Sequence, residues 1–222
     1  MKVVLLPVKD LPNAKQRLAP VLSADERRLL TRTMLRDVGS ALSACRLADR
    51  IVVVGRDPWI LQFASERKWD VIAEAEQTSE SESVDRASLL LRQQGASLVL
   101  RLPGDIPLVR AADIDSLLDI PLGLRSALLV PSRDGTGTNA LLRVPPDIFP
   151  SRFGRNSFQL HHDEAHRAGA TLDIVHNPRI SLDLDELSDL VLFLERGQET
   201  ETFRVIQQMG LSERVAALGQ GS

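Results

Sequence analysis

The sequence predicts a single α/β domain built on a mostly parallel, twisted sheet with helices on both faces. Short apolar runs of strand length alternate along the chain with longer segments of helical periodicity. This alternation is typical of strand–helix–strand units, in which a crossover helix joins two parallel strands. No repeat or long linker divides the sequence, and 222 residues fit one large α/β domain. Residues 1–222 are therefore expected to form one domain.

The expected strands are short runs rich in Val, Leu, Ile and Ala, and most are followed by turn residues. A continuous apolar run of this length is typical of a strand that is buried on both faces. We expect strands at residues 3–8, 51–54, 70–73, 97–102, 126–131, 139–144 and 172–176, with a further short strand at 182–185.

The expected helices start and stop at recognisable signals. Ser23 and Glu26 have the spacing of a capping box, which opens the first helix. Gly95 and Gly169 are expected to end two later helices. We expect helices at residues 24–44, 58–68, 84–94, 111–118, 157–168, 185–196 and 201–217, and an irregular acidic loop at 74–83.

Composition narrows the function classes. The chain is 43% hydrophobic and 26% charged, with a formal net charge of −3. It therefore has no global basic field to bind nucleic acid or a membrane surface. The N-terminal apolar run is too short for a signal peptide or a membrane span. Cys45 is the single cysteine and cannot form an intrachain disulfide, so a cytoplasmic location is expected.

Asp105 is the first candidate for chemistry, because it follows the expected strand at 97–102 in the turn Pro103-Gly104-Asp105. Ligands of open α/β sheets bind beyond the carboxyl ends of the strands, so this carboxylate is aimed at a ligand crevice. Gly104 lets another group approach closely. An Asp at a strand end also commonly stabilises a turn with its side chain, so Asp105 alone leaves both roles open.

Asp183 and Asp185 alternate with Leu182 and Leu184. In a short strand this spacing places both carboxylates on one face. Two neighbouring negative charges repel unless water or a cation separates them, and Mg²⁺ commonly takes one or two carboxylates together with substrate phosphates. With Asp105, these residues indicate a magnesium site, although Asp185 is equally suited to cap the next helix.

A basic loop follows the first expected strand and contains Lys9, Lys15 and Arg17. Cations in this place can hold a triphosphate, but a solvated basic loop has the same composition. The loop contains no glycine, which excludes a GxxxxGK[ST] phosphate loop and the GxGxxG dinucleotide fingerprint at this junction.

Two loops rich in Gly and hydroxyl side chains, at residues 135–139 and 153–157, occur in the second half. Ser157 is expected to be the N-cap of a helix, whose free N–H groups and dipole favour a phosphate. Simple turn and cap chemistry explains each loop equally well. The basic neighbours of these loops suit a small dianion with an extra carboxylate, and they are Arg133, Arg152 and Arg155.

The spacing of His162 and His166 is compatible with a zinc site on a helix. A zinc metalloprotease helix needs Glu directly after the first His, and Asp163 stands there. We therefore expect these histidines to lie on a solvated helix face.

Together these segments resemble the 2-phospho-L-lactate guanylyltransferase (CofC/FbiD) family of coenzyme F-420 biosynthesis, within the MobA-like nucleotidyltransferases. The resemblance spans nearly the whole chain, and it rests on the order of the segments as much as on any one of them. These are Pro7-Val8-Lys9, Ala14-Lys15-Gln16-Arg17-Leu18, Met34-Leu35-Arg36-Asp37-Val38, Pro103-Gly104-Asp105-Ile106-Pro107, Gly135-Thr136-Gly137-Thr138-Asn139-Ala140, Phe153-Gly154 with Ser157, and Asp183-Leu184-Asp185.

The resemblance implies a Rossmann-like fold of the nucleotide-diphospho-sugar transferase type and the transfer of GMP from GTP to a small phosphorylated acid. In this family the acid is 2-phospho-L-lactate, phosphoenolpyruvate or 3-phospho-D-glycerate, and the sequence does not decide among them. The resemblance further implies four sets of site residues: Asp105, Asp183 and Asp185 for Mg²⁺; Thr138, Gly154 and Ser157 for the phospho-acid; Lys9, Lys15, Arg17 and Gly104 for GTP; and Asp105, Lys15 and Arg17 for catalysis.

The attacking group in such a transfer is a phosphate oxygen, which is already ionised at neutral pH and needs no general base. Catalysis then depends on positioning and charge neutralisation, in agreement with a chain that shows no nucleophile–base pair.

One segment departs from the family pattern. Many relatives have a Gly-rich turn and Leu-Asn before the helix that follows the third strand, whereas this chain has Ser81-Glu82-Ser83-Val84-Asp85-Arg86-Ala87. That segment is expected to border the nucleotide, so the group that recognises guanine stays open. A molybdopterin or sugar-phosphate nucleotidyltransferase and a non-catalytic nucleotide-binding regulatory module are the alternatives. The oligomeric state is also open, and a homodimer is compatible with the sequence.

Overall fold

The computed structural model describes residues 1–9, 14–76, 78–211 and 214. Its seven-stranded sheet has the order β3-β2-β1-β4-β6-β5-β7. The strands are β1 (Lys2–Pro7), β2 (Arg50–Gly55), β3 (Asp70–Ala73), β4 (Leu98–Arg101), β5 (Ser126–Pro131), β6 (Thr138–Val144) and β7 (Thr171–Ile174). Only β6 among them runs antiparallel to its neighbours β4 and β5. The mostly parallel sheet predicted from the sequence is therefore confirmed.

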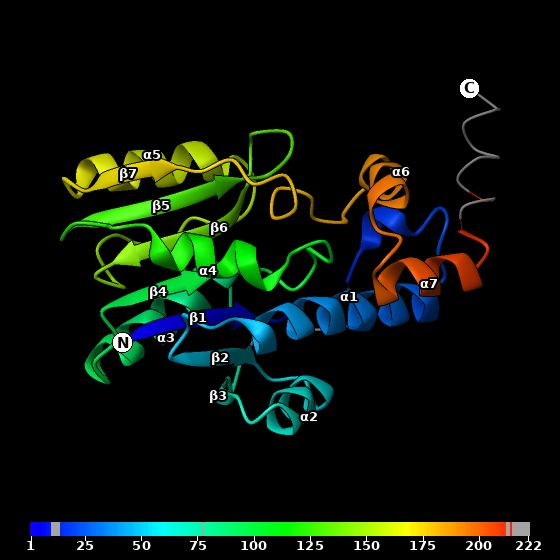
Figure 1. Ribbon diagram of the computed structural model, residues 1–222, viewed down its shortest axis with the longest axis horizontal. Coiled ribbons are helices and arrows are strands. Elements are labelled where there is room, and N and C mark those ends of the chain that lie inside the picture. Colours follow the sequence, from blue (N-terminus) through cyan, green and yellow to red (C-terminus); the bar gives the residue numbers. More distant parts are fainter. Residues whose placement is uncertain (10–13, 77, 212–213, 215–222) are drawn as a thin grey trace.

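The described helices cover both faces of this sheet and one of its ends (Figure 1). They are α1 (Ala24–Ala44), α2 (Pro58–Glu66), α3 (Glu80–Gln93), α4 (Ala111–Asp119), α5 (Ser157–Arg167), α6 (Leu187–Arg196) and α7 (Glu201–Gln208), with a short 3₁₀ helix, η2, at Gln16–Leu18. The capping box of Ser23 and Glu26 is formed at the start of α1, as predicted. The helix expected at 201–217 instead ends at Gln208 as α7.

Alternating residues of each strand face opposite layers of the core. Val4 and Leu6 of β1 pack with α1, α2 and α4 on one face of the sheet. Val3 and Leu5 pack with α3 on the other face, where α5 covers β5 and β6. Since both faces are covered, the strands are continuous apolar runs, as parallel strands usually are.

A separate apolar cluster closes the sheet beyond the carboxyl ends of the parallel strands. Leu18 of η2 and Met34 of α1 pack there against Leu182, Leu184 and Phe193. In Figure 1 this cluster corresponds to the group formed by η2, α6, α7 and the start of α1 at the right-hand end. It fixes the chain on both sides of Asp183 and Asp185, close to the loops that leave β1 and β4.

Two further predictions are wrong, one about where a helix begins and one about a short strand. α3 begins at Glu80, within the predicted irregular loop, because Ser79 and Glu82 form a capping box. The strand predicted at 182–185 is not formed, and this segment is irregular. Its side-chain alternation nevertheless holds, because Leu182 and Leu184 are buried while the two aspartates stay partly accessible.

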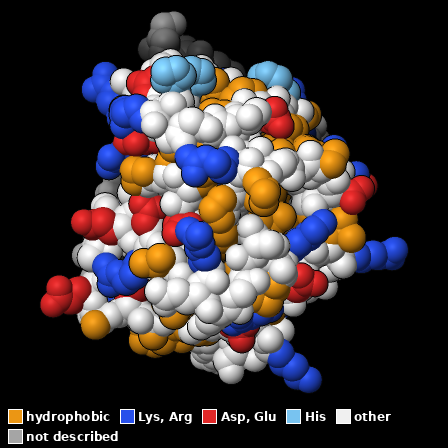
Figure 2. Space-filling view, turned by 90° about the vertical axis from the view of Figure 1, so that its left-hand side faces the viewer, with side chains coloured by type: hydrophobic (Ala, Val, Ile, Leu, Met, Phe, Trp, Pro, Cys, Tyr) orange, Lys and Arg blue, Asp and Glu red, His pale blue; other side chains and the backbone are white. Residues whose placement is uncertain are grey.

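The end of the molecule opposite α6 and α7 carries no field of a single sign. Figure 2 shows acidic and basic side chains interspersed there with small hydrophobic patches, in line with the small net charge of −3. None of the described helices has the length and apolar character needed to cross a membrane.

Candidate active site

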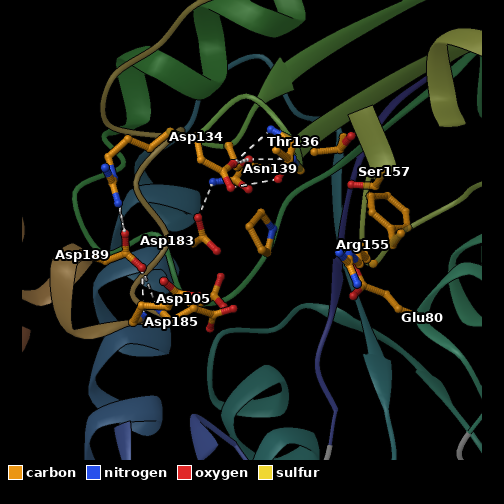
Figure 3. Close-up of a pocket in the computed structure, with 18 of the residues that line it drawn as sticks. Glu80, Asp105, Asp134, Thr136, Asn139, Arg155, Ser157, Asp183, Asp185 and Asp189 are labelled. Carbon is orange, nitrogen blue, oxygen red and sulfur yellow. Dashed lines mark hydrogen bonds and ion pairs between the residues drawn. The ribbon is translucent and has the colours of Figure 1, made fainter. Parts of the chain in front are cut away.

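The residues predicted to hold the metal lie together at the carboxyl ends of the parallel strands. Asp105 follows β4, and Asp183 and Asp185 lie between β7 and α6. One carboxylate oxygen from each of the three lies within 4.8 Å of the others. The backbone N–H of Leu184 donates to the carbonyl oxygen of Asp105 at 3.1 Å, which joins the two segments. We call these three side chains the carboxylate cluster (Figure 3).

Lys15 neutralises part of the carboxylate cluster. Its Nζ donates to Asp105 Oδ2 at 2.6 Å and also to Asp185 Oδ1. Only 5% of the Lys15 side chain is exposed, yet its pKa is raised, because the two carboxylates outweigh the cost of burying the ammonium. Lys15 has a φ of 56°, a left-handed conformation that is unfavourable for a residue with a side chain. These ion pairs help to hold it there.

The three aspartates differ in how readily they ionise. Burial opposes ionisation of Asp105, but Lys15 holds its pKa below the usual range. Burial and the nearby negative charge of Asp105 raise the pKa of Asp183 to about 6. Asn139 opposes this shift, because its side-chain amide donates to Asp183 Oδ1 at 3.0 Å. Further positive charge at the carboxylate cluster would therefore be stabilising.

The carboxylate cluster fits a hard divalent cation. Asp105 Oδ1 is buried and has no hydrogen-bond partner among the described residues. An unpaired buried acceptor is costly, and more so when it is charged. A cation at this position would remove that cost, and Mg²⁺ prefers oxygen ligands of this kind. No other group of potential metal ligands is found in the described part of the chain.

Two cavities meet at the carboxylate cluster. The first has a volume of about 640 Å³ and is lined by both Gly-rich loops, together with Asp105, Asp183 and Asp185. The second has a volume of about 540 Å³ and lies over the end of β1, against Lys9, Lys15 and Gly104. Five residues line both cavities, and they are Glu80, Arg101, Pro103, Asp105 and Asp185. Ligands in the two cavities would therefore meet at these carboxylates.

The predicted nucleotide residues divide between the two cavities. Lys9, Lys15 and Gly104 line the second cavity. A Cβ at Gly104 would lie 2.8 Å from Leu35 Cδ1, so a larger residue there would have to displace this side chain of α1. Arg17 instead lines the first cavity. It pairs with Glu186 at 2.8 Å through a largely exposed side chain, so it belongs to the rim.

The first Gly-rich loop is a preorganised turn. Asp134 accepts hydrogen bonds from the hydroxyls of Ser132 and Thr136 and from the backbone N–H of Thr136. These donors, led by Ser132, hold the pKa of Asp134 at about 2. A Cβ at Gly137 would come within 2.8 Å of Ser132 Oγ, so the tight turn needs a glycine there.

The predicted acceptor residues Thr138, Gly154 and Ser157 all line the first cavity. The hydroxyl of Thr138 is hydrogen-bonded to Nδ1 of buried His161 at 3.0 Å. Gly154 has a φ of 116°, which a residue with a side chain rarely adopts. The Ser157 hydroxyl forms no hydrogen bond with any other described residue, which leaves it available to a ligand.

The expected N-cap role of Ser157 is wrong, because Asn156 is the N-cap of α5 and Ser157 is its first residue. The N–H groups of Ser157 and Phe158 donate to the carbonyl oxygens of Gly154 and Thr136. These two helix N–H groups hold the loops together and are not free for an anion. The side chains that line the cavity must therefore supply most of the binding.

Arg155 is the cation most available to a ligand in the first cavity. Arg133 pairs with Asp189 at 2.8 Å, and Arg101 pairs with Glu80. Arg155 has no ion pair or hydrogen bond with another residue that the structure describes. Figure 3 shows it with Ser157 and Glu80 on the wall opposite the carboxylate cluster.

Sequence reasoning missed three polar residues that shape these cavities. Arg101 ends the apolar strand β4 and is only 6% exposed. Its guanidinium stacks over the Phe153 ring at 4.2 Å and donates to the Asn139 carbonyl oxygen. The sequence predicts an irregular loop at Glu80, which is in fact the first residue of α3. It gives no signal that His161 is buried while the neighbouring His162 is exposed. The one sequence signal that Arg101 has a functional position is its charge at the end of an apolar run.

The segment 81–87 mainly supports the chain at and just before the second Gly-rich loop. Asp85 accepts hydrogen bonds from Arg143 and from the backbone and hydroxyl of Ser151. The Ser81 hydroxyl accepts from the backbone N–H of Phe153 at 2.8 Å. The departure from the family pattern therefore lies beneath the second Gly-rich loop, and none of its residues lines the second cavity.

The expected solvated histidines His162 and His166 are exposed, whereas their neighbour His161 is buried and neutral. His161 Nε2 accepts a hydrogen bond from the backbone N–H of Arg152 at 2.8 Å. Burial, with the positive charges of Arg143 and Arg101, lowers the pKa of His161 to about 3.

We expect His161 to make the fold sensitive to acid. The unfolded chain binds a proton near the ordinary pKa of 6.5, which the folded chain accepts only near 3. The contribution of His161 to the free energy of unfolding is therefore complete above pH 6.5 and falls by up to about 1.4 kcal/mol per pH unit below it. Urea unfolding of the wild type and His161→Gln at pH 7 and pH 5 checks this. If the free energy of unfolding decreased equally in both proteins between pH 7 and pH 5, His161 would be excluded as the cause.

Comparisons with known proteins agree with this geometry. The chain is 35% identical over 211 residues to a protein from Conexibacter woesei named phosphoenolpyruvate guanylyltransferase, covering 92% of this chain and 95% of that protein. It is 30% identical over 218 residues to one from Methanobrevibacter ruminantium named 2-phospho-L-lactate guanylyltransferase, covering 93% and 91%.

The fold and the family are both shown. A crystal structure of a candidate nucleotide-diphospho-sugar transferase from Desulfovibrio desulfuricans G20 superposes with a TM-score of 0.78 at 19% identity, covering 96% of this chain and 97% of that one. The family described as "Guanylyl transferase CofC like" matches residues 1–219. This protein therefore belongs to the CofC-like guanylyl transferase family.

Proposed function

We propose that this protein is a Mg²⁺-dependent guanylyltransferase of the cytoplasm, acting in coenzyme F-420 biosynthesis. It joins GMP from GTP to a small phosphorylated carboxylic acid and releases pyrophosphate. The acid is 2-phospho-L-lactate, phosphoenolpyruvate or 3-phospho-D-glycerate. The names of the relatives support the reaction class. The observation that carries the proposal is the pair of cavities that share Asp105 and Asp185.

GTP is assigned to the second cavity. Pro7, Val8 and Pro103 give it apolar walls for a base, while Lys9 and Lys15 supply positive charge for phosphates. The buried side chain of Lys15 is already oriented by Asp105 and Asp185. Its ammonium therefore lies at the junction of the cavities, close to where the α-phosphate would react.

Mg²⁺ is assigned to Asp105, Asp183 and Asp185, whose fit to a hard cation is supported by the unpaired Asp105 Oδ1. When bound, the ion would neutralise phosphate charge at the reacting centre. The first cavity needs such neutralisation, because more carboxylates than guanidinium groups line it. Without a cation it would repel an acceptor that carries both a phosphate and a carboxylate.

The acceptor is assigned to the first cavity, with its phosphate towards the carboxylate cluster. Only this orientation brings the phosphate oxygen to the α-phosphate of a nucleotide in the second cavity. The acceptor's carboxylate then faces the opposite wall, where Ser157 and Arg155 lie. Thr138 lines the same cavity. Arg155 supplies a guanidinium suited to bidentate binding of a carboxylate.

The proposed step is a displacement at the α-phosphorus of GTP. An acceptor phosphate oxygen forms the new P–O bond, and the bond between the α-phosphorus and the bridging oxygen of the β-phosphate breaks. The electron pair leaves with pyrophosphate. The protein positions both substrates and neutralises charge, which accounts for most catalysis in phosphoryl transfer.

Replacing Ser157 by Ala should weaken acceptor binding by about 1.5–3 kcal/mol, the usual value of a hydrogen bond to a charged group. The affinity for GTP should change far less, because Ser157 lines only the first cavity. Apparent KM values for both substrates, measured with the same enzyme, check the difference. A larger loss for GTP would show that this wall binds the nucleotide instead.

The experiment that tests the proposed function is a matrix of four nucleoside triphosphates and a set of acceptors, analysed by mass. We expect GTP to be preferred over ATP, CTP and UTP, and at least one of the three phospho-acids to accept GMP. Transfer only to a sugar phosphate or molybdopterin would overturn the acceptor class. GTP binding without any transfer would favour a regulatory nucleotide-binding module.

A further inference from the structure

Selection of guanine requires an acceptor group in the nucleotide cavity. The edge of guanine presents an N1–H and an exocyclic N2 amine as donors beside the O6 acceptor, whereas adenine presents its N1 as an acceptor. A carboxylate matches both guanine donors and repels the lone pair of adenine N1. The side chain that reads guanine is therefore expected to be an Asp or Glu in the second cavity.

Three carboxylates among the described residues line that cavity: Glu80, Asp105 and Asp185. Asp105 and Asp185 bind Lys15 and belong to the carboxylate cluster. Glu80 does not bind Lys15 and is not part of the carboxylate cluster. It is the first residue of α3 and lines both cavities, and Figure 3 shows it across the first cavity from the cluster. Of the three carboxylates, Glu80 is therefore the one left to contact a base in the second cavity.

Glu80 is held in place before any ligand binds. Its Oε1 accepts a charge-assisted hydrogen bond from Nη2 of Arg101. Arg101 is itself fixed, because it stacks on Phe153 and donates to the carbonyl oxygen of Asn139 at 3.1 Å. A buttressed carboxylate loses little side-chain entropy when it binds a ligand. Arg101 also balances its charge, which reduces repulsion of the triphosphate.

Glu80 keeps free acceptor capacity towards the cavity. A carboxylate has about four lone-pair sites, and Arg101 accounts for the one hydrogen bond that Glu80 makes with the described residues. A quarter of the Glu80 side chain remains exposed. The two donors of a guanine edge can therefore reach it without breaking the ion pair.

We propose that Glu80 is the specificity-determining residue for the base and accepts hydrogen bonds from N1–H and the N2 amine of guanine. This inference rests on the proposed function, because it assumes that the second cavity receives GTP. It places the guanine edge against Glu80 and leaves Lys9 and Lys15 of the same cavity for the triphosphate.

Inosine triphosphate tests this assignment, because hypoxanthine keeps N1–H and O6 but lacks the N2 amine. The test compares the wild type with Glu80→Gln and Glu82→Gln. Glu82→Gln makes the same charge change in the same helical turn, and Gln also suits this capping-box position. Equilibrium binding of GTP, ITP and ATP is measured without acceptor, and kcat/KM for each nucleotide is measured with the best phospho-acid.

In the wild type and Glu82→Gln, GTP should bind at least about tenfold more tightly than ITP, the effect of one charge-assisted hydrogen bond. In Glu80→Gln the GTP/ITP ratio should approach one, and kcat with ITP should stay within about twofold of the wild type. An unchanged ratio in folded Glu80→Gln would overturn the assignment. Equal losses for GTP and ITP would also overturn it, because they would show that Glu80 only positions Arg101.

The binding measurement separates this inference from the proposed function. If wild-type protein transfers no nucleotide to any acceptor, the proposed function fails, but the GTP/ITP binding ratio still tests Glu80. If transfer proceeds and Glu80→Gln keeps the wild-type ratio in binding and kcat/KM, the reaction stands and only the role of Glu80 is rejected.

Discussion

Replacing Asp105 by Asn is expected to lower turnover about a hundredfold or more, a loss comparable to that of one key electrostatic group in an active site. The amide keeps the shape of the side chain but loses the charge that faces Lys15 and the proposed Mg²⁺. The fold should persist, because the side chain lies at the junction of two cavities. The measurement is kcat at saturating substrates, with limiting and with excess Mg²⁺.

Asp173→Asn provides the matched control, because Asp173 is an exposed residue of β7 outside both cavities. Its turnover should equal that of the wild type. Circular dichroism and urea unfolding establish that both variants fold. Near-normal turnover of folded Asp105→Asn at limiting Mg²⁺ would remove Asp105 from the metal site.

Replacing Asp85 by Ala is expected to destabilise the fold by about 3–5 kcal/mol, the usual result of removing one partner from a buried ion pair. The Arg143 guanidinium is almost completely buried and pairs with Asp85 at 2.9 Å. Without Asp85 the buried guanidinium loses its ion-pair partner. Ser88 and the Phe149 carbonyl still accept hydrogen bonds from it, and the negative charge of Asp147 still acts on it. The measurement is the free energy of unfolding in urea.

Asp147→Ala is the control for this loss. Asp147 pairs with Arg92 of α3, but half of the Arg92 side chain is exposed, so the loss should be much smaller. Asp85→Ala should also weaken acceptor binding more than GTP binding, because Asp85 fixes Ser151 beside the second Gly-rich loop. Equal stability losses in the two variants would contradict a special role for the buried pair.

Local patterns predicted most of the fold. The apolar runs predicted strand positions, because their short length, their β-branched residues and the turn residues that flank them favour a strand over a buried helix. The boundary of α3 was missed because its first turn consists of Ser and Glu, which suggest a loop. The helix forms there because Ser79 and Glu82 satisfy each other's backbone N–H groups. The N-cap of α5 was predicted one residue too late, at Ser157, because Asn156 adopts a left-handed conformation and is itself the N-cap.

The sequence also indicated that Asp105, Asp183 and Asp185 lie together, and they do, since both segments follow strands that end at the same edge of the sheet. It did not predict that Lys15 would lie between Asp105 and Asp185. These contacts join residues that are 90 and 170 positions apart in the sequence. The pairing of Glu80 with Arg101 and the burial of His161 likewise depend on packing between α3, β4 and α5. Such partners have no local signature.

The most direct test of the proposed reaction uses a phospho-acid whose phosphate oxygens carry ¹⁸O. The enzyme is incubated with this acid, GTP and Mg²⁺, and ³¹P NMR follows the position of the label. Attack by the acceptor phosphate at the α-phosphorus predicts a diphosphate product with ¹⁸O in its bridge and pyrophosphate without label. The absence of a diphosphate product, or label in pyrophosphate, would contradict the proposed attack of the acceptor phosphate at the α-phosphorus of GTP.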